Sequence, residues 1–199
     1  MRNRGIFAML AMLFFLACND ESSEVGDKYF KTGKYEEAIA AYNEYLELKP
    51  KHVKSLYNRG RAYEELGQFD QAMKDFKFVL KEDPNNVNAL MSIGKDAFYR
   101  KSDFESSIYY FEKALKRDAD NAVALTFKGK SHQRLGNLKE AMEDYNAAIS
   151  VDKDYGDTYL SRGALRIFLK QRAKACADFR VAKGLGVKEA DRVIAKYCK

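Results

Sequence analysis

One spacing recurs through the chain and limits what it can fold into. A glycine marks each copy, and successive glycines lie 34, 34, 35 and 34 residues apart: Gly26, Gly60, Gly94, Gly129 and Gly163. Each copy continues with a small residue, Ala38, Ala72, Ser107, Ala141 or Ala175, and with a ring four residues later, Tyr42, Phe76, Phe111, Tyr145 or Phe179. A repeat of this length predicts one supersecondary unit stacked on copies of itself, with a continuous core between neighbours.

Each copy predicts two helices joined by a tight turn. The glycine and the small residue let two helices approach closely, and the ring fills the space beside them. Gly33, Gly67 and Gly136 fall in the predicted turns, where a positive φ is easily reached. Pro50 and Pro84 follow the predicted second helices and end them.

These positions resemble the tetratricopeptide repeat, a helix–turn–helix unit of 34 residues. The resemblance covers residues 19–186 and implies an all-α fold, a right-handed α-solenoid of five repeats plus a C-terminal capping helix. The expected repeats are 19–52, 53–86, 87–121, 122–155 and 156–186, and the expected capping helix is 187–199. Apolar residues share one face of that last helix: Val187, Ala190, Val193, Ile194 and Tyr197.

The third repeat departs from the pattern at its turn. It has one extra residue and carries Lys101 and Ser102 where repeats one, two and four have glycine. We therefore expect a looser turn near Ser102, within a stack that continues.

Charges at two repeat positions vary together. Where position seven is basic, position twenty-three is aspartate, and where position seven is apolar, position twenty-three is alanine or tyrosine. This predicts partly buried ion pairs inside three repeats: Arg59–Asp75, Lys128–Asp144 and Arg162–Asp178. Such pairs fix register more than they add stability.

The first 17 residues have the pattern of an export signal. Arg2 and Arg4 precede an uncharged apolar stretch that is too short to span a bilayer comfortably. The following "FLAC" resembles a bacterial lipobox, which implies a signal peptide at 1–17, lipid attachment at Cys18 and a short tether at 18–22. The alternatives are ordinary signal cleavage after Ala17 and an uncleaved anchor.

Export would change the net charge of the mature chain and the state of its cysteines. Loss of Arg2 and Arg4 lowers the formal net charge from +6 to +4, which does not indicate a nucleic-acid partner. Cys176 and Cys198 form an even pair once Cys18 carries lipid, and disulfides persist outside the cytosol. We expect a bridge between them; the alternative is two buried free thiols.

Catalytic constellations do not stand out in the sequence. His132 falls at a position where a packed ring is usual, and the adjacent Ser131 cannot face it on a helix. His52 is expected in a solvated loop. The sequence therefore predicts a protein that is not an enzyme and that needs neither cofactor nor metal.

Binding is expected on a concave groove, which in this family the first helix of each repeat lines. The resemblance places the partner-binding groove at Phe30, Tyr57, Arg61, Met91, Lys95, Phe98, Phe127, Lys130 and Arg134, with Tyr99, Gln133, Leu160, Ile167 and Phe168 in a wider set. Arg61, Lys95 and Lys130 share position nine of three consecutive repeats and would form a basic line. The alternative is that the rings pack between helices and the cations are merely solvated.

The predicted function is a non-enzymatic adaptor, lipid-anchored in the bacterial cell envelope as an outer-membrane lipoprotein facing the periplasm or the cell surface. Its partner would be a protein or peptide, with no nucleic acid, and a homo-oligomer is possible. One alternative is the ligand-binding component, for peptide or glycan, of an outer-membrane uptake system. Another is a structural solenoid that associates with itself.

Overall fold

The structure, a computed structural model, describes residues 21–199. Cys18, the predicted site of lipid attachment, lies outside the described residues, as does the predicted signal peptide. Within the described range the chain forms eleven α-helices and one π-helical turn, and no strand. The elements are α1 (Glu21–Lys31), α2 (Tyr35–Leu48), α3 (Val53–Glu65), α4 (Phe69–Glu82), α5 (Val87–Asp96), η1 (Ala97–Lys101), α6 (Phe104–Leu115), α7 (Ala122–Leu135), α8 (Leu138–Val151), α9 (Gly156–Phe168), α10 (Arg172–Gly184) and α11 (Glu189–Tyr197).

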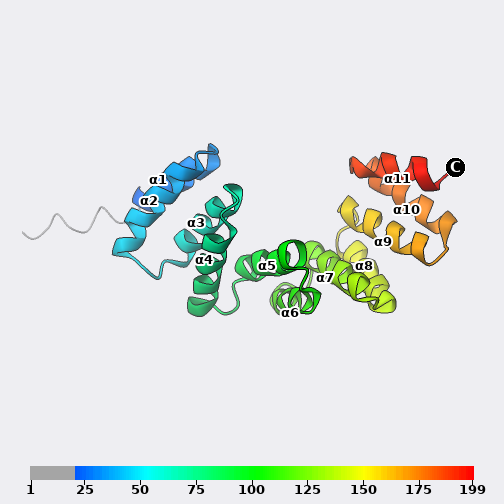
Figure 1. The fold of residues 1–199 in the computed structure, drawn as a ribbon, viewed down its shortest axis with the longest axis horizontal. Coiled ribbons are helices and arrows are strands. Elements are labelled where there is room, and N and C mark those ends of the chain that lie inside the picture. Colours follow the sequence, from blue (N-terminus) through cyan, green and yellow to red (C-terminus); the bar gives the residue numbers. More distant parts are fainter. Residues whose placement is uncertain (1–20) are drawn as a thin grey trace, which may run out of the picture. The chain divides into compact units, whose positions relative to one another are not determined.

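The helices pack in consecutive pairs within two compact units. Unit 1 ends at Asp83 and contains the pairs α1/α2 and α3/α4. Unit 2, Pro84–Lys199, contains the pairs α5/α6, α7/α8 and α9/α10, and α11 packs on α10 (Figure 1). The predicted all-α fold of paired helices followed by a final helix is confirmed. None of these helices is long and apolar enough to cross a membrane.

Inside each repeat, the ring at position twenty-four lies against the glycine at position eight. A Cβ added to Gly60 would come within 2.6 Å of the Phe76 ring, and one added to Gly94 within 3.0 Å of the Phe111 ring. Both rings are fully buried. The glycine is therefore required by packing, because the ring occupies the space that any side chain would need.

The turns between paired helices use a left-handed residue. Gly33, Gly67 and Gly136 have φ of 73°, 71° and 84°, as predicted. Ser102 and Lys170 take the same conformation in repeats three and five, with φ of 53° and 59°. In repeat three the π-helical turn η1 precedes Ser102 and takes up the extra residue, since a π-helical turn is wider than an α-helical turn. The expected irregularity near Ser102 is confirmed.

The three predicted ion pairs are all present. The closest nitrogen–oxygen distances are 2.6 Å for Arg59–Asp75, 2.9 Å for Lys128–Asp144 and 2.7 Å for Arg162–Asp178. All three carboxylates are buried. Each pair joins the two helices of one repeat and fixes how the first helix is rotated against the second.

The C-terminal helix is held by a covalent bond and by backbone contacts. A disulfide joins Cys176 on α10 to Cys198, directly after α11. The guanidinium of Arg172 donates hydrogen bonds to the carbonyl oxygens of Tyr197 and Lys199. Ala190 is fully buried where α11 packs on α10.

Candidate functional site

The predicted groove residues fall in both units. Phe30, Tyr57 and Arg61 belong to unit 1, whereas Met91, Lys95, Phe98, Phe127, Lys130 and Arg134 belong to unit 2. The basic line from Arg61 to Lys130 therefore stays a prediction as a continuous feature. Its two members in unit 2, Lys95 and Lys130, are brought together around one ring, as described below.

In unit 1 the predicted residues are engaged with their own neighbours. Phe30 contacts the Tyr35 ring edge-to-face, with ring centroids 5.4 Å apart. Arg61 forms ion pairs on its own helix with Glu64 at 2.8 Å and Glu65 at 3.4 Å. The charge of Arg61 is thus largely compensated within α3, and this residue offers less to an anionic partner than the sequence suggests.

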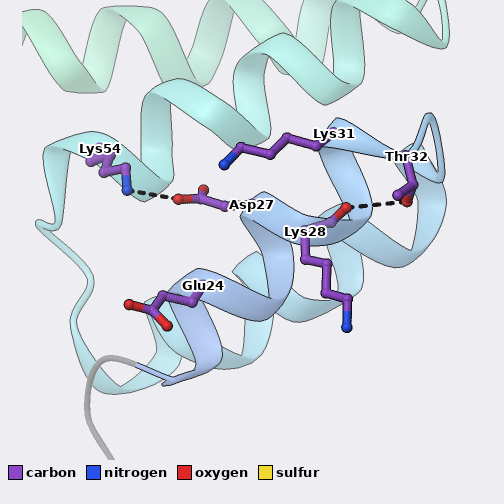
Figure 2. A pocket seen from close by; sticks show the side chains of 6 residues that line it. All are labelled: Glu24, Asp27, Lys28, Lys31, Thr32 and Lys54. Carbon is purple, nitrogen blue, oxygen red and sulfur yellow. Dashed lines mark hydrogen bonds and ion pairs between the residues drawn. The ribbon is translucent and has the colours of Figure 1, made fainter.

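A hollow of about 550 Å³ opens on the first-helix side of unit 1, between α1 and α3 (Figure 2). Asp27 lies at its centre and accepts hydrogen bonds from Lys54 at 2.6 Å, Tyr42 at 2.7 Å and Asn58 at 2.8 Å. Burial acts to raise the pKa of Asp27, but these three donors outweigh it and lower the pKa. A carboxylate held in this way is a structural anchor between repeats one and two and a poor candidate for a base.

In unit 2 the apolar members of the predicted groove form a floor. Phe127 is only 5% exposed and stacks on Phe111, with ring centroids 5.4 Å apart and 20° between the planes. Phe98 and Tyr99 meet Phe127 edge-on at 5.8 and 5.6 Å. Met91 packs against the same cluster. Phe127 was expected at the groove edge, but its ring is part of the core and a partner cannot reach most of it.

Cations cover this aromatic floor. The ammonium nitrogen of Lys130 lies 4.8 Å from the centroid of the Phe127 ring, and that of Lys95 lies 5.5 Å from it. The guanidinium of Arg134 sits 4.6 Å from the centroid of Phe104. These distances are those of cation–π contacts, so the lysines are placed by the ring beneath them.

Asp157, at the start of α9, affects the pKa values of Lys130 and Tyr155. Burial lowers the pKa of Lys130, and the neighbouring charge of Lys95 lowers it further, whereas Asp157 opposes the shift. Burial, then Asp157 and Tyr99, raise the pKa of Tyr155 to about 12. Asp157 was not among the predicted residues, although it occupies position two of repeat five, which the same repeat register assigns to the groove.

Two rings on the first helices of unit 2 are exposed. Tyr99 is 67% exposed and Phe168 is 69% exposed, and both occupy position thirteen of their repeats. Large rings exposed in this way are common at interaction sites, because they offer apolar area at little cost in side-chain entropy. We call Tyr99, Lys95, Lys130, Asp157 and the buried Phe127 the lysine site.

The arrangement suits binding better than chemistry. Within residues 21–199, no group of three His, Cys, Asp or Glu side chains could hold a metal ion. His132 is largely buried and lies 3.9 Å from Asp144, in the structural role expected for it. His52 is not simply solvated, as was expected: it is half-buried, and its ring caps the start of α3 by accepting a hydrogen bond from the Ser55 amide.

Comparison with known families agrees with this fold. Models of the TPR repeat match residues 26–67, and models of the tetratricopeptide repeat match residues 53–86 and 96–157. The chain is a tetratricopeptide repeat protein. Repeats of this family form non-catalytic scaffolds that bind proteins or peptides, in agreement with the prediction that the chain is not an enzyme.

Individual relatives share the repeats at low identity. BBSome complex member BBS4 from Bos taurus is 28% identical over 159 residues, which are 79% of this chain and 30% of that protein. MamA from Desulfovibrio magneticus RS-1 has a TM-score of 0.76 at 20% identity, covering 84% of this chain and 94% of that one. YrrB, described as a TPR protein with an unusual peptide-binding site, has a TM-score of 0.72 at 18% identity, covering 89% and 91%.

The coverage and identity of these matches limit what can be concluded from them. The chain spans less than a third of the length of BBS4, the first curated relative. The likeness to MamA and YrrB is below a quarter identity and shows the fold alone. The partner of this tetratricopeptide repeat protein therefore has to be argued from its own side chains.

Proposed function

We propose that this repeat protein is a non-enzymatic adaptor, lipid-anchored in the bacterial cell envelope, that binds a partner protein through the first helices of its repeats. The family supports a protein-binding scaffold. The observation that carries the binding site is the lysine site of unit 2, where Lys95 and Lys130 converge on Phe127 beside the exposed Tyr99.

Sequence features support the anchor. The apolar stretch before Cys18 has the charge pattern and length of an export signal. Only two residues, Asn19 and Asp20, separate Cys18 from α1, so a lipid on this cysteine would keep the repeats close to a membrane surface. The Cys176–Cys198 disulfide fits a compartment outside the cytosol. An outer-membrane location, facing the periplasm or the cell surface, belongs to the same proposal.

Partner capture tests the binding role. The protein is purified from its own membranes after mild cross-linking, beside a variant with Arg61→Glu, Lys95→Glu and Lys130→Glu. A matched control reverses three exposed lysines outside the predicted groove, Lys77, Lys139 and Lys153. The proposal expects a partner that the native protein and the control recover and that the groove variant loses, provided urea unfolding gives all three the same stability. Equal recovery by all three would place the binding surface elsewhere.

Fractionation tests the anchor. Cys18→Ser should move the protein from the membrane pellet to the soluble fraction and abolish incorporation of radiolabelled palmitate. Ordinary secretion predicts soluble, unlabelled protein with or without the substitution, and an uncleaved anchor predicts membrane-bound protein in both cases. Protease treatment of intact cells then separates a surface location, in which the protein is degraded, from a periplasmic one.

One observation favours the uptake alternative. Tyr99 and Phe168 are exposed rings of the kind on which sugars stack. Oligosaccharides can be titrated calorimetrically into the native protein and into a Tyr99→Ala, Phe168→Ala variant. Binding to the native protein but not to the variant would support a ligand-binding component. Heat traces without saturable binding would leave the adaptor as the better account.

A further inference from the structure

The lysine site has a rigid base. Lys95 comes from α5 and Lys130 from α7, and their ammonium groups lie 5.5 and 4.8 Å from the centroid of the same ring, that of Phe127. Phe127 is fixed in turn by its stack on Phe111 and by the edges of Phe98 and Tyr99. Two cations from neighbouring repeats therefore lie over the same fixed ring.

Within the described part of the chain, Lys130 has no direct ion-pair partner. Among the described residues, no carboxylate comes within ion-pair distance of its ammonium group, which instead lies over the Phe127 ring. The charges that act on it are Asp157 and Lys95, which have opposite signs. Lys128, two residues earlier on the same helix, instead has Asp144 at 2.9 Å. The helix thus pairs one lysine internally and leaves the other available.

Unit 1 shows the closed counterpart of this arrangement. There, Asp27 at position nine and Lys54 at position two of the next repeat meet at 2.6 Å. In unit 2 the signs are reversed, with Lys130 at position nine and Asp157 at position two of the next repeat, and the pair does not close to an ion-pair distance. The same two repeat positions therefore form an ion pair in unit 1, whereas in unit 2 they leave Lys130 without a direct ion pair.

The local charges select the ligand. One carboxylate would balance Lys130 and gain a second attraction from Lys95, whereas a phosphate dianion would carry a second negative charge towards Asp157. The exposed ring of Tyr99 adjoins the platform, so a residue beside that carboxylate can pack an aromatic or branched apolar side chain on it. These features fit a peptide segment better than a free small anion.

We propose that Lys130 and Lys95 bind a single glutamate or aspartate side chain of the partner, and that the neighbouring aromatic or branched apolar residue of the same segment packs on Tyr99. This proposal rests on the adaptor function and specifies the partner segment that the adaptor would bind. The lysine site is then the point at which the scaffold distinguishes its partner segment from other extended chains.

Capped dipeptides are suitable probes, because capping removes the terminal charges. N-acetyl-Phe-Glu-amide is compared with its Gln counterpart and with N-acetyl-Ala-Glu-amide, each titrated into the full-length protein in detergent. The protein is reductively methylated with ¹³C-formaldehyde, which keeps the lysine charge and gives each ammonium an NMR signal. Lys95→Arg and Lys130→Arg variants, which lack one signal each but keep the positive charge, assign the two resonances.

The expected result is a saturable shift of the Lys95 and Lys130 resonances with the Phe-Glu probe, and a Kd about tenfold or more weaker for the Gln probe. Lys130→Gln should remove the difference between the Glu and Gln probes, whereas Lys139→Gln, at an exposed lysine of α8, should keep it. Lys130→Arg should retain part of it. Tyr99→Ala should remove the advantage of the Phe-Glu probe over the Ala-Glu probe.

Several outcomes would overturn the assignment. Equal affinity for the Glu and Gln probes, unmoved Lys130 resonances up to millimolar probe, or an equal loss with Lys139→Gln would each show that no carboxylate site exists here. Equal affinity for the Phe and Ala probes would remove Tyr99 from it. If a partner is captured but the dipeptide does not bind, the adaptor function is supported and this site is rejected. If the dipeptide binds but no partner is captured, the site is supported and the adaptor function is not.

Discussion

The guanidinium of Arg59 donates two hydrogen bonds to the carboxylate of Asp75, at 2.6 and 2.8 Å, from the other helix of the same repeat. A third donor of Arg59 reaches the side-chain oxygen of Asn43 in the preceding repeat at 2.8 Å. Arg162 repeats this pattern with Asp178 and Asn146. One arginine therefore ties together the two helices of its own repeat and the second helix of the repeat before it.

Removal of one partner from this link should be costly. Asp75→Ala leaves Arg59, whose side chain is 20% exposed, without its carboxylate, and should lower the free energy of unfolding by about 3 kcal/mol. Replacement of both residues, Arg59→Met with Asp75→Leu, should recover most of that loss, because apolar packing then replaces the pair. Urea unfolding measures both.

The exposed pair Lys139–Glu143 is the matched control for this experiment. Glu143→Ala should leave the unfolding midpoint almost unchanged, because surface ion pairs contribute little. If Asp75→Ala were as mild as Glu143→Ala, the pair would be an incidental contact and would not fix the rotation of the helices.

The repeat glycines should tolerate no side chain. Gly60→Ala would bring a methyl group to 2.6 Å from the Phe76 ring and should cost about 1–3 kcal/mol, despite the better helix propensity of alanine. Gly184→Ala is the control, because that glycine lies at the end of α10 with open space around it. It should leave stability unchanged or raise it slightly in a thermal melt. Equal melting temperatures for the two variants would mean that the ring can move aside at little cost.

Acid should weaken the fold partly through Asp27. Its pKa is lowered in the folded chain, because the donors Lys54, Tyr42 and Asn58 outweigh burial. A carboxyl group of this kind stabilises the fold above its unfolded pKa of about 3.8, and the contribution is lost as the pH falls through the lower folded value. Asp144 has the opposite sign, since burial raises its pKa and protonation relieves the fold.

Urea unfolding at pH 7 and at pH 3 can separate these effects. The drop in stability between the two should be smaller for Asp27→Asn than for the native protein, because the variant has already lost the ionised form. Asp144→Asn should show the reverse, with a larger drop than the native protein. Identical drops for all three proteins would contradict both assignments.

The repeat pattern predicted the contacts that lie inside one repeat, because repeat positions seven and twenty-three can be compared directly between copies. Arg59–Asp75 and its two equivalents followed from such a comparison. Asn43 and Asn146 were not found, since they act across the boundary between one repeat and the next. Asp157 was missed for a related reason: its influence on Lys130 also crosses a boundary, and neither residue type nor spacing shows whether the two side chains close into an ion pair.

The floor of the lysine site shows another limit of the pattern. Repeat position assigned Phe127 to the groove edge, yet the stack on Phe111 draws its ring into the core. That outcome depends on which rings neighbour each other in space, and aromatic residues occur at both buried and exposed positions of these helices. On the described first helices, Tyr99 and Phe168, both at position thirteen, are the exposed rings.

The disulfide should hold the last helix on the array. Cys176→Ser with Cys198→Ser opens a loop between residues 22 apart in the sequence and should lower the free energy of unfolding by about 3 kcal/mol in the chain-entropy model. Because Arg172 also binds the carbonyl oxygens of Tyr197 and Lys199, α11 should stay folded part of the time. Hydrogen exchange should therefore become faster in Glu189–Tyr197 than in α9, while α1–α4 keep their protection. A uniform increase over the whole chain would show that the bridge stabilises all repeats together and not the final helix.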